Sequence, residues 1–182
     1  MKAVFVCLLV GVVFVTGCKV GEKNCERVDN GSCGNACCKM EYEFDMSPAS
    51  LVRDLIRVIG TGGPDQRYAL QTTAEGTYGF TDLREFNLTS TNGRAVAYLG
   101  QAVHTTGPLG IECVFHDTVN FLVNFGDADG SCVLTAFSIS EIAGALGDDG
   151  QNFYNIKTVI DALPPYAKES RLLGCPLPGT EA

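Results

Sequence analysis

The spacing of the cysteines constrains this chain more than any other feature of its sequence. Eight of the nine cysteines follow an apolar N-terminal leader: Cys18, Cys25, Cys33, Cys37, Cys38, Cys113, Cys132 and Cys175. An even number of cysteines behind such a leader is typical of a disulfide framework, here of up to four bridges. Five of them lie within residues 18–38 and three lie far downstream, so at least one bridge must connect the N-terminal cluster to the rest of the chain. We expect Cys175 to make that connection.

Residues 1–17 are typical of a secretory signal peptide. Lys2 precedes an apolar run that ends at Val15, shorter than the about 20 residues that a membrane span requires. Val15 and Gly17 fit cleavage just before Cys18. The sequence Val15-Thr16-Gly17-Cys18 also fits a bacterial lipobox, in which Cys18 would carry lipid, but we favour simple cleavage. The sequence therefore predicts a secreted or lumenal protein of the secretory or envelope pathway, with no membrane span.

The rest of the chain divides into three parts by residue pattern. Residues 18–46 are rich in cysteine, glycine and charge and show no period, which predicts a stapled N-terminal segment. Residues 47–175 are expected to form a single α+β domain, and residues 176–182 a tail.

The expected domain begins and ends with a helix. Ser47 suits an N-cap, Pro48 the first helical position and Gly60 the C-terminal stop, which predicts a helix over 47–60. A second helix is predicted over about 150–163. Between them, strands are expected at 66–73, 84–90, 94–106, 110–117, 117–125 and 131–140, with a hairpin turn at 126–130. We expect an antiparallel sheet flanked by an N-terminal and a C-terminal helix.

Composition and spacing argue against several classes of function. The net charge is −8 and no basic residues cluster, so nucleic acid is not an expected partner. The cysteines lack paired zinc spacing, and the turn at 126–130 does not match a calcium loop, so neither metal nor cofactor is predicted. The glycine-rich 60–65 follows a helix, so it is no phosphate loop. Asn30 and Asn87 begin glycosylation sequons.

The residues GDDGQNFYNI, 147–156, are the most suggestive local stretch. Asp148 or Asp149 is expected to cap the last helix, with Gly150 in the tight turn before it. Asn152 is then an amide close to a helix N-terminus, where a polar ligand can be held.

Two longer segments, FHDTVNFLV and TAFSISEIAGALGDDGQNFYNI, resemble the C-terminal half of the family called domain of unknown function 1499. The matching pieces are residues 116–119, 138–140 and 148–152, whereas Glu141 stands where the family has an arginine. The resemblance implies an α+β domain found in algal, plastid or bacterial envelope contexts, without an established activity.

The favoured function is non-catalytic binding of a small apolar or amphipathic ligand on or beside the sheet. The candidate ligand-binding residues are His116, Ser138, Ser140, Asp148, Gly150 and Asn152. One alternative is a small hydrolase-like enzyme that uses the polar residues near 138–152. Another is a structural extracellular or cell-wall-associated protein.

Overall fold

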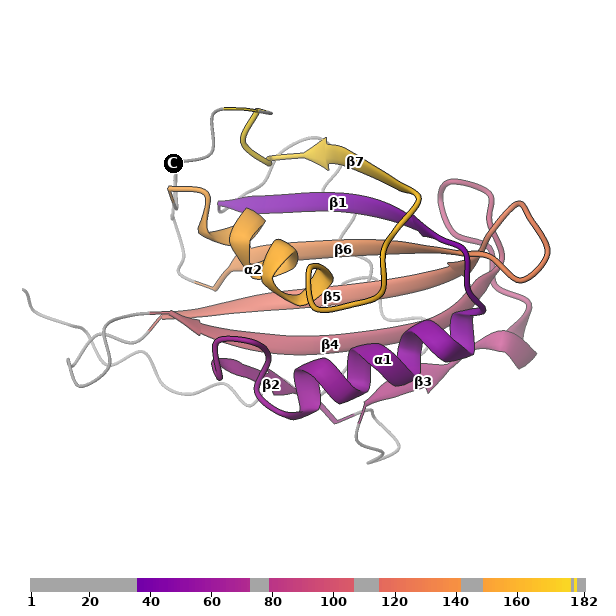
Figure 1. Ribbon diagram of the computed structural model, residues 1–182, viewed down its shortest axis with the longest axis horizontal. Helices are drawn as coiled ribbons and strands as arrows, with labels where there is room; N and C mark the ends of the chain where they lie inside the picture. The colour runs from indigo at the N-terminus through magenta and orange to yellow at the C-terminus, as the bar shows by residue number, and fades with distance from the viewer. Residues whose placement is uncertain (1–35, 73–78, 107–114, 142–148, 178, 180–182) are drawn as a thin grey trace, which may run out of the picture.

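The fold is an antiparallel sheet with two helices, as the sequence predicted (Figure 1). The structure is a computed structural model, and it describes residues 36–72, 79–106, 115–141, 149–177 and 179. The elements follow in the order β1 (Cys37–Phe44), α1 (Pro48–Gly60), β2 (Tyr68–Leu70), β3 (Phe80–Asp82), the 3-10 helix η1 (Arg84–Phe86), β4 (Val96–Thr106), β5 (Phe115–Phe125), β6 (Cys132–Ser140), α2 (Gln151–Ile160) and β7 (Lys168–Leu173).

The strand order brings the two ends of the described chain together. The sheet runs β2-β4-β5-β6-β1-β7, with β3 also paired to β4. The first strand, β1, pairs antiparallel with both β6 and β7, so the beginning and the end of the domain lie side by side (Figure 1). The predicted hairpin is confirmed, because β5 and β6 pair through the turn at 126–130.

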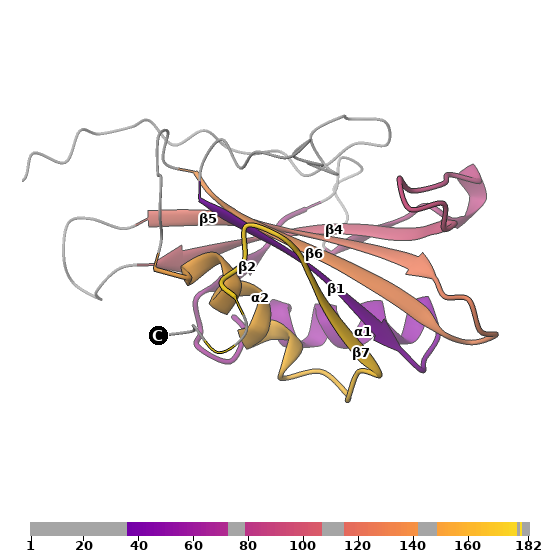
Figure 2. The same cartoon turned by 90° about the horizontal axis from the view of Figure 1, so that it is seen from above.

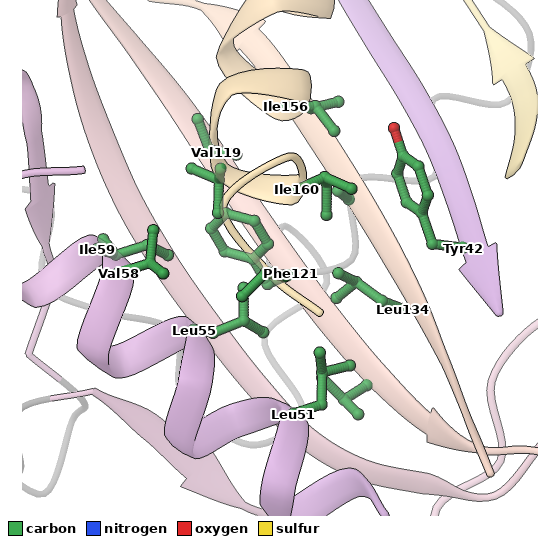
Figure 3. Packing of buried hydrophobic residues seen from close by; sticks show 14 of the residues in the cluster. Tyr42, Leu51, Leu55, Val58, Ile59, Val119, Phe121, Leu134, Ile156 and Ile160 are labelled. Carbon is green, nitrogen blue, oxygen red and sulfur yellow. The ribbon is translucent and has the colours of Figure 1, made fainter. Parts of the chain in front are cut away.

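Both helices pack on the same face of the sheet (Figure 2). Apolar side chains of α1 and α2 meet those of the central strands in one cluster, which includes Leu51, Leu55, Ile59, Val119, Phe121, Leu134, Ile156 and Ile160 (Figure 3). Each such side chain contributes about 1.5–3 kcal/mol through burial. This cluster is the main core, and it fixes where both helices lie.

Helix α1 forms as its sequence predicted. Pro48 stands in the first turn, and the side chain of Ser47 accepts a hydrogen bond from the backbone N–H of Ser50. Leu51, Leu55 and Ile59 recur at helical spacing, and all three are fully buried against the sheet.

Three parts of the secondary structure differ from the prediction. Residues 84–90 are not a strand but the short helix η1 and an isolated bridge at Thr89, because Asn87 adopts a left-handed conformation with φ of 51°. Strand β1 lies inside the segment expected to be aperiodic. Its alternation of buried Met40, Tyr42 and Phe44 with charged residues was a readable strand signal. The short strands β3 and β7 were also not predicted.

The side chains that point away from the helices form a second face of the sheet. We define this face by ten buried residues: Cys37, Leu99, Gln101, Asn120, Leu122, Asn124, Val133, Thr135, Phe137 and Ile139. Neither α1 nor α2 lies over it (Figure 2). Within the described ranges, no helix is long and apolar enough to cross a membrane.

Candidate functional site

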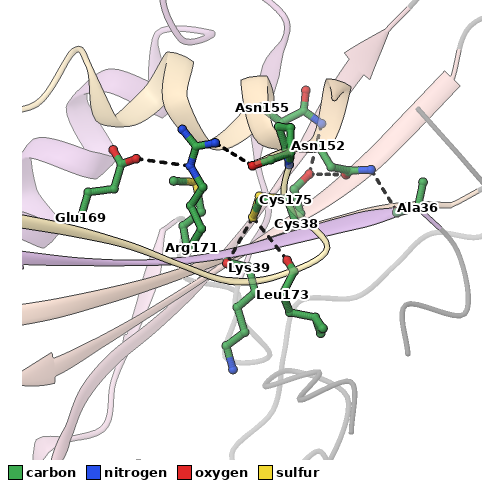
Figure 4. The surroundings of a disulfide bond; sticks show 12 residues. Ala36, Cys38, Lys39, Asn152, Asn155, Glu169, Arg171, Leu173 and Cys175 are labelled. Atoms are coloured by element: carbon green, nitrogen blue, oxygen red, sulfur yellow. Dashed lines mark hydrogen bonds and ion pairs between the residues drawn. A yellow bond between two sulfur atoms is a disulfide. The ribbon is translucent and has the colours of Figure 1, made fainter. Parts of the chain in front are cut away.

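Three of the predicted ligand-binding residues meet beneath the N-terminus of α2. Ser138 and Ser140 lie on β6 and point toward α2, and Asn152 lies in its first turn. The Ser138 hydroxyl donates to Asn152 Oδ1 at 2.6 Å, and Asn152 Nδ2 donates to Ser140 Oγ at 3.0 Å. Asn152 Nδ2 also donates to the carbonyl of Ala36 at 2.9 Å (Figure 4). The two serines and the asparagine therefore form one buried hydrogen-bonded group.

Asn155 and Asp117 extend this group, although neither was among the predicted site residues. Asn155 Nδ2 donates to Asp117 Oδ2 at 2.9 Å and to Ser138 Oγ at 3.1 Å. Asn155 Oδ1 accepts from Gln151 Nε2 at 2.7 Å. Two signals in the sequence could have identified these residues, although they were not used: Asp117 alternates with the core residues of β5, and Asn155 lies one helical turn after Asn152.

Tyr68 and His104 continue the polar region toward the edge of the sheet. The hydroxyl of Tyr68 donates to the carbonyl of Asn155 at 2.6 Å, and burial raises the pKa of this phenol, which keeps it neutral. The His104 ring packs against that of Tyr68, and its Nε2 lies 2.9 Å from Asp65 Oδ2. His104 Nδ1 is buried without a hydrogen-bond partner.

The other predicted site residues do not join this polar group. His116 lies on β5 with its side chain on the opposite face to Asp117, exposed and 3.4 Å from Thr105 Oγ1 through Nδ1. Asp148 lies outside the described residues. Gly150 lies directly before α2 and is its N-cap, with φ of 81°.

The predicted capping of α2 by an aspartate is wrong for Asp149. Gly150 occupies the N-cap position in a left-handed conformation, and no side chain makes the capping bond. Asp149 has φ of 49°, so it too belongs to the turn that precedes the helix. The tight glycine turn itself is confirmed.

The arrangement beneath α2 is suited to holding the helix rather than to catalysis. A nucleophilic serine needs an adjacent base, whereas the Ser138 hydroxyl donates to an amide oxygen. His104 lies directly opposite Asp117 on β4, but its Nε2 is close to Asp65, and His116 lies on the other face of the sheet. Among the described residues, no group of three or more histidine, cysteine or acidic side chains is arranged to hold a metal ion.

The second face carries a different set of amides. Gln101 Nε2 donates to Asn120 Oδ1 at 2.7 Å, so these neighbours on β4 and β5 pair with each other. Asn124 follows Asn120 on the same face of β5, with Leu122 between them. Asn124 is 0% exposed, and neither its Oδ1 nor its Nδ2 has a hydrogen-bond partner. Val133 lies directly across from it on β6, so an unpaired amide stands in apolar surroundings.

The expected bridge from Cys175 is present. Cys175 is bonded to Cys38 at the start of β1, which ties the segment after β7 to the sheet (Figure 4). Cys37 is also disulfide-bonded. Cys132, predicted as a disulfide cysteine, is instead a free thiol buried in the core, in register with Phe44 at the opposite end of β1 from Cys38. Burial raises the pKa of this thiol to about 12.

The remaining predicted modification and bridge positions fall partly outside the described ranges. Cys18, Cys25, Cys33, Cys113 and Asn30 lie there, as does the leader. Asn87 is exposed in the turn after η1, which is a position accessible to a glycosyltransferase.

Comparisons of the chain with protein-family models, with curated proteins and with solved structures gave no match. The resemblance to domain of unknown function 1499 therefore stays a prediction.

Proposed function

We propose that this protein is an exported, disulfide-bonded domain that binds a small neutral amphipathic ligand without catalysis. The ligand is held at the second face of the sheet, with its polar group on the amide of Asn124. Export is supported by the leader and by the Cys38–Cys175 bridge, because disulfides persist in oxidising compartments.

The unpaired amide of Asn124 is the observation that carries the proposal. A buried polar group without a partner costs about 1–3 kcal/mol, and native proteins rarely retain one without a functional reason. Both the donor and the acceptor of Asn124 are unpaired. A ligand group that both donates and accepts hydrogen bonds, such as an amide or an alcohol, would pair with both atoms of the Asn124 amide.

The neighbours of Asn124 favour an apolar body for the ligand. Leu122 and Val133 are buried beside it on the same face. Small-molecule sites are typically apolar with a few placed polar groups that fix orientation. The net charge of −8 disfavours an anionic headgroup, so a neutral one is expected.

The polar group beneath α2 supports a non-catalytic protein. Its serine hydroxyls and asparagine amides bond to one another and to the backbone. The hydrolase-like alternative needs His116 beside Ser138, but these side chains lie on opposite faces of the sheet.

Two asparagines on the same strand and the same face provide a matched test. Asn124→Leu removes the unpaired amide, whereas Asn120→Leu removes an amide that is paired with Gln101. We expect Asn124→Leu to raise the free energy of unfolding of the ligand-free protein by about 1–2 kcal/mol, and Asn120→Leu to lower it by a similar amount.

Thermal unfolding with decanamide, and separately with decanoate, measures binding. Decanamide is expected to raise the Tm of the wild type more than decanoate does, and to leave the Tm of Asn124→Leu unchanged. An equal rise in wild type and Asn124→Leu would place the ligand elsewhere. The absence of any rise in wild type, together with a more stable Asn124→Leu, would support the structural alternative instead.

A further inference from the structure

A short hairpin precedes β4 and lies on the side of the sheet away from α1 and α2 (Figure 2). We call these residues, 89–95, the strap. Thr89 bridges to Ala95 at its base, and its tip is a turn in which the backbone N–H of Gly93 donates to the carbonyl of Ser90 at 2.9 Å. The strap therefore has a defined structure of its own.

The tip of the strap contacts β1, which is the third strand from β4 in the sheet order. Asn92 Nδ2 donates to Glu41 Oε2 at 3.2 Å, and Arg94 Nη1 lies 3.8 Å from Glu41 Oε1. Glu41 alternates with the core residues Met40 and Tyr42, so its carboxylate stands on the second face. Because β5 and β6 lie between β4 and β1, the strap crosses both of them on that face.

This crossing lies at the end of the second face that carries Asn124. Val96, the first residue of β4 after the strap, pairs in register with Asn124, and Asn124 pairs with Val133 on β6. On β1, the residue across from Val133 is Glu43, the next residue after Glu41 on the same face. The strap therefore closes over the part of the sheet in which the unpaired amide of Asn124 is buried.

The contacts that hold the strap closed are few and polar. Apart from Ser90, its residues are exposed or half-buried, and the second acidic partner of Arg94, Asp127 at 3.3 Å, has a side chain that is 87% exposed. Closure also leaves Arg94 Nε buried without a hydrogen-bond partner. Half-exposed ion pairs contribute little, and segments with few buried apolar contacts open most readily. The closed strap is therefore only weakly favoured over an open one.

Backbone irregularities flank the strap on both sides. Before it, Asn87 adopts a left-handed conformation with φ of 51°. After it, the pairing of β4 with β5 shifts register between Val96 and Tyr98. Hinge motions are absorbed at such loop and element-terminal positions. The strap can therefore lift while the rest of β4 keeps its place in the sheet.

We propose that the strap gates access to the site at Asn124, with the carboxylate of Glu41 as its latch. The ligand enters when the strap lifts, and Asn92 and Arg94 return to Glu41 once the ligand is bound. The identity of the ligand rests on the proposed function, whereas the motion of the strap is measurable without any ligand. Because the same latch closes the free and the bound protein, weakening it speeds entry and exit alike and leaves the affinity nearly unchanged.

The test measures how fast methyl methanethiosulfonate modifies Asn124→Cys, alone and combined with Glu41→Gln or Glu43→Gln. Peptide mass spectrometry locates the modification. Glu43 is the matched control, because it lies on the same strand and face as Glu41 but accepts a bond from Lys168 of β7 at 2.9 Å. Glu41→Gln is expected to raise the rate about fivefold, and Glu43→Gln to change it by less than about twofold. Equal rates in all three proteins, or equal rises in both glutamine variants, would overturn the gate.

Hydrogen–deuterium exchange tests the same motion in proteins that keep Asn124, so the result does not depend on the folding of Asn124→Cys. The backbone N–H of Phe125 donates to the carbonyl of Ala95, at the base of the strap, at 2.9 Å. This amide is expected to exchange about fivefold faster in Glu41→Gln than in wild type or Glu43→Gln, with the amides of β6 unchanged. An unchanged exchange rate at Phe125 in Glu41→Gln would overturn the gate.

Titration with decanamide, followed by NMR line shapes, separates the gate from the proposed function. Glu41→Gln is expected to raise the association and dissociation rates about fivefold each, and to leave Kd within about twofold of wild type. A higher dissociation rate at an unchanged association rate would show that Glu41 holds the ligand itself, and would overturn the latch. Faster exchange in Glu41→Gln with no binding of decanamide by wild type would overturn the proposed function while confirming that the strap opens.

Discussion

At the scale of single residues, the polar side chains beneath α2 decide how that helix sits on the sheet. Asn155 is fully buried and joins Asp117, Ser138 and Gln151 through its side chain. Each bond adds only about 1 kcal/mol net, but an unmatched partner in the interior costs more than the bond contributes. The group therefore specifies one orientation of α2, since a rotation would leave several buried groups unpaired.

Asn155→Ala is expected to lower the free energy of unfolding by about 2–3 kcal/mol, because it leaves the buried carboxylate of Asp117 and the Ser138 hydroxyl without their amide donor. Urea denaturation followed by circular dichroism measures the change. Gln71→Ala is the control, because that amide makes only a 3.4 Å bond to a nearby carbonyl, and its effect should stay within about 0.5 kcal/mol. Equal effects of the two variants would contradict the structural role of Asn155.

At the scale of elements, local sequence signals predicted α1 better than α2. Ser47, Pro48 and an apolar face at helical spacing specify α1 within its own residues, and the structure confirms each. In α2, the expected aspartate cap is replaced by the left-handed Gly150. The first turn of α2 is instead held through the side chain of Asn152, which donates to Ser140 on β6, and such a contact between elements cannot be read from the residues around the cap.

Gly150→Ala is expected to cost about 1–2 kcal/mol, because φ of 81° is unfavourable for a residue with a Cβ. The added methyl group itself has room, since its nearest neighbour, a ring carbon of Tyr154, lies 3.5 Å away. Gly150→Asn should cost less, because asparagine tolerates the left-handed region. Thermal unfolding of the two variants checks the order, and an asparagine variant as unstable as the alanine one would point to packing instead of backbone strain.

At the scale of the whole molecule, β1 and the Cys38–Cys175 bridge close the fold. Strand β1 lies between β6 and β7, so an N-terminal strand completes a sheet whose centre is formed by later residues. The bridge joins positions separated by 137 residues, and it connects β1 covalently to the segment that follows its neighbour β7. A cross-link over so long a loop restricts the unfolded chain strongly.

Removal of this bridge is expected to lower the free energy of unfolding by about 3–5 kcal/mol. The double variant Cys38→Ser with Cys175→Ser is the appropriate form, because it leaves neither partner of the bridge as a thiol that could mispair. Guanidinium denaturation of wild type and double variant under non-reducing conditions measures the difference. A loss below about 1 kcal/mol would show that strand pairing alone holds β7 in place.

The sequence by itself determined the features that are encoded in neighbouring residues. These are the fold class, the bounds of α1, the β5–β6 hairpin and the tight turn at Gly150. Ser138, Ser140 and Asn152 were predicted as ligand-binding residues, and the structure shows that their side chains bond to one another; ligand binding by them stays a prediction.

Only the tertiary structure decided which distant residues meet. It placed β1 in the sheet, brought Asp117 and Asn155 into the polar group, put His116 on the opposite face and left Cys132 without a partner. These outcomes depend on strand register, and a shift of one residue would reverse every side chain of a strand. Register is set by the summed packing of residues far apart in the sequence, so no local pattern can report it.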